Sequence, residues 1–110
     1  MSNENLSPLE NAILQVFFDE YGNQGFPLPG TIKIRNRENT GAGRYVYLHS
    51  SAEVRCEDGY LDMGGRFIEM EGVPNGLMAV VSIENSRLDQ LEISTYEEDW
   101  DGEERPWKII

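Results

Sequence analysis

The hydrophobic period of this chain changes once, and that change limits the possible folds more than any other feature. After Ser7, apolar residues recur at helical spacing, at Leu9, Ala12, Ile13, Val16 and Phe17. Beyond the connector at 25–30, short segments instead alternate apolar and polar residues with a period of two. The sequence therefore predicts an α+β fold, with one N-terminal helix followed by a sheet.

The helix is predicted over residues 7–22. Ser7, Pro8 and Glu10 form a capping box with proline at the first helical position. Gly22 is placed to end the helix. Residues 1–6 are expected to form a flexible N-terminus.

The sheet is predicted over residues 31–96, as about six antiparallel strands that pack one face against the helix. Most breaks between strands carry glycine or asparagine, which favour turns. The chain of 110 residues suits a single domain that ends in a separate C-terminal segment, 97–110. The expected strands cover 31–35, 44–49, 52–56, 66–71, 77–84 and 88–96.

The charge is strongly acidic, with a formal net value of −11. Residues 56–104 carry 14 acids against Arg66 and Arg87. Such a chain is repelled by nucleic acids and by anionic membrane surfaces, and it attracts basic proteins. A single cysteine, Cys56, and a polar N-terminus predict a cytoplasmic protein with no membrane partner.

The acidic charge is densest near the C-terminus. Six carboxylates fall within Glu97–Glu104, around Trp100, with Tyr96 just before and Trp107 just after. Exposed indoles are unusual in a solubilising tail, so we expect a surface that grips a basic partner. A disordered acidic end remains the alternative. The candidate partner-binding residues in this region are Tyr96, Glu97, Glu98, Asp99, Trp100, Asp101, Glu103 and Glu104.

No catalytic, cofactor or metal site is predicted. Alternate acids after Glu97 resemble part of a calcium loop, but Lys108 stands where the loop needs its final bidentate glutamate. His49 and Cys56 could meet only if their strands are neighbours, and Cys56 follows the pattern of a buried residue. The sequence therefore predicts a protein that is not an enzyme.

A basic cluster precedes this acidic half of the chain. Lys33, Arg35 and Arg37 are expected on one strand face, with Arg44 on the next strand. The cluster could bind an anion, but we favour an internal counterweight to the acidic half.

The C-terminal half resembles small bacterial immunity proteins of polymorphic and contact-dependent toxin systems. The apolar strand 76–84, the strand 87–96 and the acidic end with Trp100 carry the resemblance, over roughly residues 73–107. It implies a protein that neutralises a toxin domain. By resemblance, Glu92, Tyr96 and Trp100 fall on the matching segment, which adds Glu92 to the candidate partner-binding residues.

Together these features predict a non-enzymatic immunity protein that occludes the active site of a basic, nuclease-type toxin. A nucleic-acid mimic that inhibits another basic protein would present the same surface, so it remains an alternative. A small enzyme or ligand-binding sheet domain is the third possibility, and a deep apolar pocket beside His49 would favour it.

Overall fold

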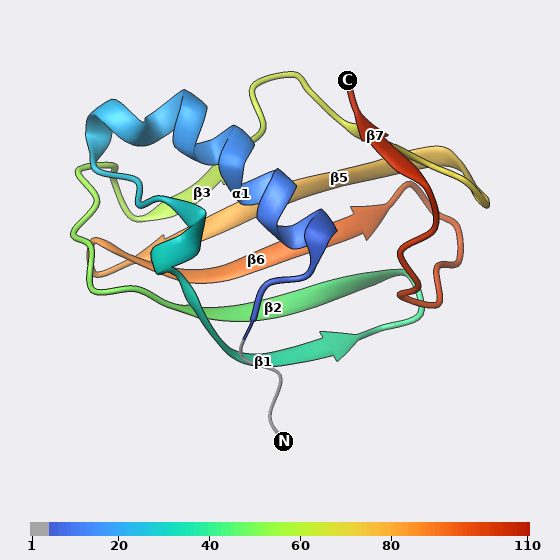
Figure 1. Cartoon of the computed structure of the whole chain (residues 1–110), viewed down its shortest axis with the longest axis horizontal. Helices are drawn as coiled ribbons and strands as arrows, with labels where there is room; N and C mark the ends of the chain where they lie inside the picture. The colour runs from blue at the N-terminus through green and yellow to red at the C-terminus, as the bar shows by residue number, and fades with distance from the viewer. Residues whose placement is uncertain (1–4) are drawn as a thin grey trace.

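A computed structural model describes residues 5–110, in which one helix lies across one face of an antiparallel sheet (Figure 1). The helix α1 spans Pro8–Tyr21 and begins with the predicted capping box. The Ser7 hydroxyl accepts from the Glu10 amide at 3.1 Å, and the Glu10 carboxylate accepts from the Ser7 amide at 2.9 Å. The predicted α+β architecture is confirmed. Positions 1–4 of the expected flexible terminus lie outside the described residues.

Within the described residues, seven strands form one sheet in the order β1-β2-β6-β5-β4-β7, and β3 pairs with β5 beside β4. That is slightly more than the six strands predicted. Short 3-10 helices, Gly22–Gln24 and Pro29–Thr31, link α1 to the sheet. The strands are β1 Lys33–Asn39, β2 Gly43–His49, β3 Gly59–Asp62, β4 Ile68–Met70, β5 Val73–Glu84, β6 Arg87–Thr95 and β7 Trp107–Ile109.

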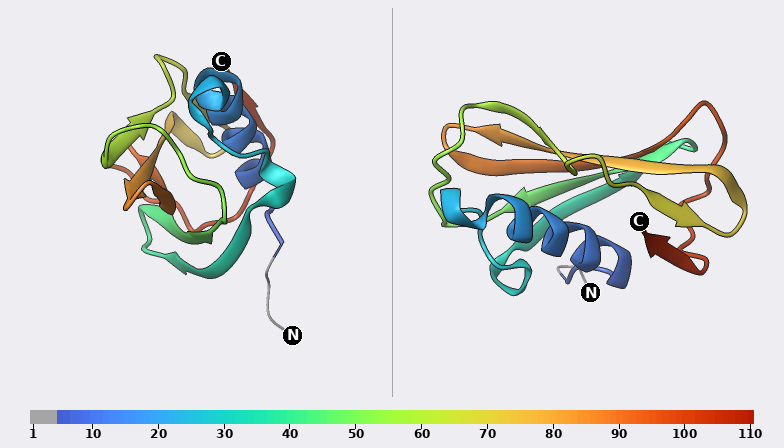
Figure 2. Two further views of the ribbon diagram at one scale, coloured as in Figure 1. Left: turned by 90° about the vertical axis from the view of Figure 1, so that its left-hand side faces the viewer. Right: turned by 90° about the horizontal axis from the view of Figure 1, so that it is seen from above.

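The molecule has two layers, and only one face of the sheet is covered (Figure 2). The helix and the end of the chain lie over the inner face, while the described residues place no second layer on the outer face. The extents of 36 × 36 × 20 Å fit a sheet with a single layer packed on it.

The core lies between α1 and the inner face. Because side chains alternate along strands, residues paired across neighbouring strands share a face. Val46, Leu91 and Val81 form one inner row across β2, β6 and β5, and all three are fully buried. The helix contributes Leu9, Ile13, Leu14 and Phe17, which are also fully buried.

The strand predicted over 52–56 does not form. Its backbone bonds connect separate turns, since Val54 donates to the Ser86 carbonyl and Arg55 donates to the Gln24 carbonyl, both at 2.7 Å. The segment therefore bridges the β5–β6 turn and the end of the helical region instead of pairing with a strand. The sequence did not predict the strands β3 and β7.

A β-bulge in β1 changes the expected placement of the basic cluster. The register shifts between Ile34 and Asn36, so Arg37 pairs with Val46 and belongs to the inner face. Arg35 lies at the shift, where it donates to the Leu48 carbonyl at 2.9 Å and pairs with Asp89 at 3.5 Å. The expectation that Lys33, Arg35 and Arg37 share one strand face is therefore wrong.

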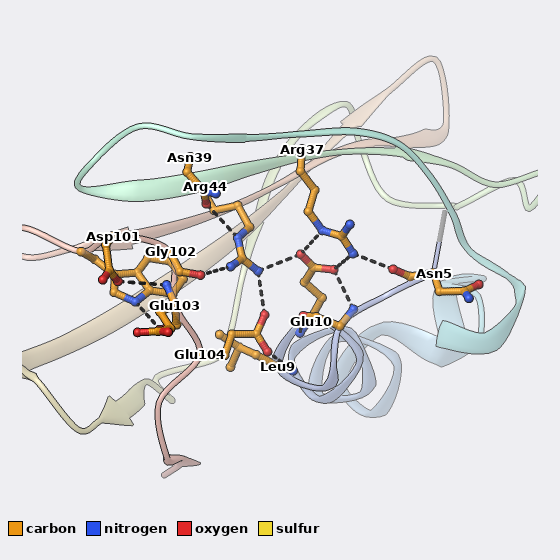
Figure 3. A network of polar contacts seen from close by, with 12 residues as sticks. Asn5, Leu9, Glu10, Arg37, Asn39, Arg44, Asp101, Gly102, Glu103 and Glu104 are labelled. Atoms are coloured by element: carbon orange, nitrogen blue, oxygen red, sulfur yellow. Dashed lines mark hydrogen bonds and ion pairs between the residues drawn. The ribbon is translucent and has the colours of Figure 1, made fainter. Parts of the chain in front are cut away.

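Arg37 and Arg44 instead meet the fully buried carboxylate of Glu10 (Figure 3). Arg37 contacts the two Glu10 oxygens at 2.7 Å each, and Arg44 contacts Oε2 at 2.9 Å. Arg44 also pairs with Glu104 at 2.7 Å, and Glu104 accepts from the Leu9 amide at 3.1 Å. These four charged residues, Glu10, Arg37, Arg44 and Glu104, are called the Glu10 network below.

Opposing effects act on the ionisation of Glu10. Burial favours the neutral acid, but hydrogen bonds from Arg37 and the Ser7 amide, with the charges of both arginines, hold its pKa below the ordinary value. Because the folded pKa is lowered, the carboxylate stabilises the fold above its unfolded pKa. That stabilisation is lost as the pH falls through the folded pKa.

The first prediction concerns Glu10→Gln. At pH 7 it should lower the free energy of unfolding by ~3 kcal/mol, because buried arginines lose their counter-charge. Urea unfolding at several pH values should show the difference shrinking as the pH falls below the unfolded pKa of glutamate, about 4.3, and disappearing once the pH has passed the lowered folded pKa. Glu103→Gln is the control, because that side chain is 71% exposed. Equal stability of Glu10→Gln and the parent at pH 7 would contradict this account.

Candidate protein-binding surface

The acidic C-terminal segment divides into two groups of carboxylates with different surroundings. Asp101 and Glu103 pair with Arg105 at 2.8 and 3.2 Å, and Glu104 pairs with Arg44. The bond from Arg105, with that from the Glu103 amide, lowers the pKa of Asp101 to about 2. Each of these three acids is paired with an arginine of the chain.

The second group of carboxylates makes no ion pair with the described residues. Among the described residues, no cation lies within ion-pair distance of Glu97, Glu98, Asp99 or Glu92. Three of them follow β6 directly, and Glu92 lies on β6 itself. Of the nine predicted site residues, four acids therefore remain without an ion-pair partner among the described residues, and three acids are paired with arginines.

Trp100 lies in the interior, with only 2% of its surface exposed. Its indole N–H donates to the Glu103 carbonyl at 2.9 Å, and its ring lies 5.1 Å from the Arg44 guanidinium. Its backbone amide donates to the Gly41 carbonyl at 2.8 Å. The expectation of an exposed indole is therefore wrong, because a satisfied N–H and a cation over the ring remove the penalty for burying it.

A backbone turn and one hydrogen bond fix the segment between β6 and Trp100. Glu97 adopts a left-handed backbone conformation with φ 60°, which turns the chain after β6. The Glu98 carboxylate then accepts from the Asn75 amide at 2.8 Å. Tyr96 precedes the turn and is 45% exposed. The unpaired acids are therefore held on an ordered turn.

These acids border a hollow of about 390 Å³ where β2 begins and β6 ends. Its wall combines aromatic and acidic groups: Tyr45, Glu92, Glu97, Glu98 and Asp99. We call it the first hollow. The acids paired with arginines, Asp101, Glu103 and Glu104, do not line this hollow. The acids without an ion-pair partner among the described residues do, so the hollow is an acidic recess.

The first hollow opens on the outer face of the sheet, which carries tyrosines that the sequence analysis did not select. Tyr45 pairs with Glu38 on β1 and with Glu92 on β6, so carboxylates flank its ring on both sides. The rings of Tyr45 and Tyr47 stack at 6.5 Å between centroids. Burial and the neighbouring Glu38 carboxylate raise the pKa of Tyr47, which keeps its phenol protonated.

The signal for these tyrosines was only partly present in the sequence. Tyr45 and Tyr47 alternate with the buried Val46 and Leu48, which already placed them on the opposite face. Tyr60 gave no such signal, because its strand β3 is only four residues long. Which face would remain uncovered depends on the three-dimensional packing.

Other chemistry considered from the sequence finds little support in the geometry. Among residues 5–110, no three histidine, cysteine or acidic side chains gather in a way that could hold a metal ion. The Cys56 thiol contacts Gln24 Oε1 at 3.2 Å, and burial raises its pKa. A thiol with a raised pKa is a poor nucleophile at neutral pH.

No family model, curated protein or solved structure matches this chain. In the described part of the chain, no helix is long and apolar enough to cross a membrane.

The second prediction compares how much the buried Trp100 and the exposed Tyr96 contribute to stability. Trp100→Ala should lower the free energy of unfolding by ~3 kcal/mol or more, because it empties a buried site beneath Arg44. Tyr96→Ala, at an exposed position, should cost about 1 kcal/mol or less. Urea unfolding followed by circular dichroism measures both. A Trp100→Ala protein as stable as the parent would show that the indole is not part of the core.

Proposed function

We propose that this protein is a non-enzymatic inhibitor that binds a basic protein and occludes its active site. In its most specific form, it is an immunity protein for a nuclease-type toxin domain. The observation that carries the proposal is the set of unpaired carboxylates fixed around the first hollow. The resemblance to immunity proteins supplies the toxin class, and the single cysteine favours a cytoplasmic setting.

Three arginines of the chain pair with acids other than those at the first hollow. Arg37, Arg44 and Arg105 pair with Glu10, Glu104, Asp101 and Glu103. Like charges held close together repel, and a cationic partner would relieve that repulsion. A fixed acidic recess therefore favours association with a protein that presents lysines or arginines.

The inhibitory mechanism would be occlusion. A nuclease binds phosphates through basic side chains at its active site, and carboxylates at the first hollow would pair with those side chains. Long-range attraction from a chain of net charge −11 would speed the encounter. Tyr45 would supply aromatic contact area at the centre of the hollow.

The third prediction tests this surface against a charge-matched control. Glu97→Gln with Asp99→Asn removes two charges at the first hollow, and Asp19→Asn with Glu20→Gln removes two on α1. Both variants have the same net charge. The first pair should lower the association rate about tenfold at low salt and weaken its salt dependence, while the second should change it far less.

The measurement uses a partner captured from the native host and then purified. Its association rate is followed over a series of salt concentrations, together with inhibition of its activity. We expect a basic partner, inhibition at one-to-one stoichiometry and a rate that falls with salt. A partner bound at a rate independent of salt, or with equal effects of the two variant pairs, would overturn the proposal.

A further inference from the structure

The outer face beyond the first hollow has features of its own. One row crosses four strands through Tyr47, Gln90, Ser82 and Tyr60. The next row contains Tyr45, Glu92, Val80 and Asp62. Tyr60 is the most exposed large apolar side chain of the described residues, at 75%. The first row thus ends in a tyrosine on each side, and the second combines Tyr45 with the carboxylates of Glu92 and Asp62.

A second hollow, of about 420 Å³, lies on this face toward the β5–β6 turn. Its wall again pairs an aromatic ring with acids: Tyr60 with Asp58, Glu84 and Asp89. Asp58 accepts from the Asn85 and Ser86 amides at 2.9 and 3.2 Å, which fixes this wall. The first row contributes Tyr60 to the second hollow, and the second row contributes Tyr45 to the first hollow.

We propose that the whole outer face is a docking surface for an arginine-bearing face of a basic protein. The inference rests on the proposed function and extends it to the second hollow. Strand spacing gives the face a size of about 20 Å by 20 Å. That is about 400 Å², roughly half of the ~800 Å² per partner of a standard interface, so the face fits a small, transient contact.

Arginine fits this surface better than lysine for two reasons. A guanidinium is flat and weakly hydrated, so it stacks on a tyrosine ring, whereas an ammonium keeps its water more firmly. It also presents parallel N–H groups that a carboxylate accepts in pairs. Glu38 and Glu92 flank Tyr45, and Asp58 and Glu84 line the second hollow with Tyr60, so each ring has carboxylates within reach of a stacked guanidinium.

A second copy of this chain is a poor occupant of the same surface. Two copies would bring Glu92, Asp62 and Glu84 of one outer face against those of the other, and the net charge of −11 would add to the repulsion. Arg35 reaches this face near the second hollow, where it contacts Asp89 at a distance of 3.5 Å. Charge complementarity thus favours a basic partner.

The test compares an oligo-arginine peptide with an oligo-lysine peptide of equal length, titrated into isotopically labelled full-length protein. Amide NMR signals locate the bound peptide. We expect shifts at both hollows and along the row from Tyr47 to Tyr60, with about fivefold tighter binding of the arginine peptide.

Variants at the second hollow make the test specific. Tyr60→Ala should weaken arginine-peptide binding about threefold and reduce the preference over lysine, whereas Tyr60→Phe keeps the ring and should preserve both. Leu28→Ala, at another exposed apolar residue, is the control and should have no effect. Because Tyr60 is largely exposed, these variants should fold normally.

The outcomes separate the two proposals. Shifts confined to Glu92, Glu97 and Asp99, with equal affinity for both peptides, would overturn the arginine-docking face and leave the acidic inhibitor standing. Binding to the outer face that is unchanged in Tyr60→Ala would also overturn it. No shift on the outer face with either peptide at low salt would count against both proposals.

Discussion

The buried carboxylate of Glu10 is the interaction on which the rest of this structure depends. It lies on the first turn of α1, yet it holds Arg37 of β1 and Arg44 of β2, and Arg44 in turn holds Glu104. A buried charge that loses its partner costs several kcal/mol, so these groups form a unit that assembles together or not at all. One network therefore fixes the helix, the β1–β2 hairpin and the C-terminal segment relative to one another.

The same network decides which acids remain available to a partner. Arg44 lies over Trp100 and pairs with Glu104, and Arg105 pairs with both Asp101 and Glu103. The chain between β6 and Trp100 is then held from both sides, with Glu98 fixed to the Asn75 amide. Glu97 and Asp99 are left beside Glu92 at the first hollow. An acidic stretch that looks uniform in sequence thus separates into a structural part and an exposed part.

Local signals explain what the sequence could predict. The capping box at Ser7 and Glu10, the apolar helix stripe and the alternation of Val46 and Leu48 with tyrosines each act over a few residues. They fix the helix, most of the strands and the class of fold. The sequence also showed an excess of basic residues in the first strands that could balance the acidic half.

The errors arise where distant parts of the chain meet. The bulge in β1 turns Arg37 inward, where it meets Glu10, 27 residues away in sequence. Trp100 is buried because Arg44 and the Gly41 carbonyl come from another hairpin. The alternation of Ala52, Val54 and Cys56 resembles a strand, but the Val54 and Arg55 amides donate to the carbonyls of Ser86 and Gln24, which belong to separate turns. Tertiary contacts override local pattern at each of these positions.

The backbone of the outer face is held rigidly at β6, and this rigidity affects how a partner protein would bind there. β6 is paired on both sides, with β2 and β5, so the backbone beneath Glu92 and Gln90 is fixed by hydrogen bonds in both directions. Carboxylates on such a support cannot move apart to relieve their repulsion, and a partner that binds them need not order a flexible chain. A solubilising tail gains nothing from such fixed geometry, since loose acids repel other molecules equally well. Under the proposed function, the fixed backbone beneath Glu92 would hold its carboxylate in place for a partner.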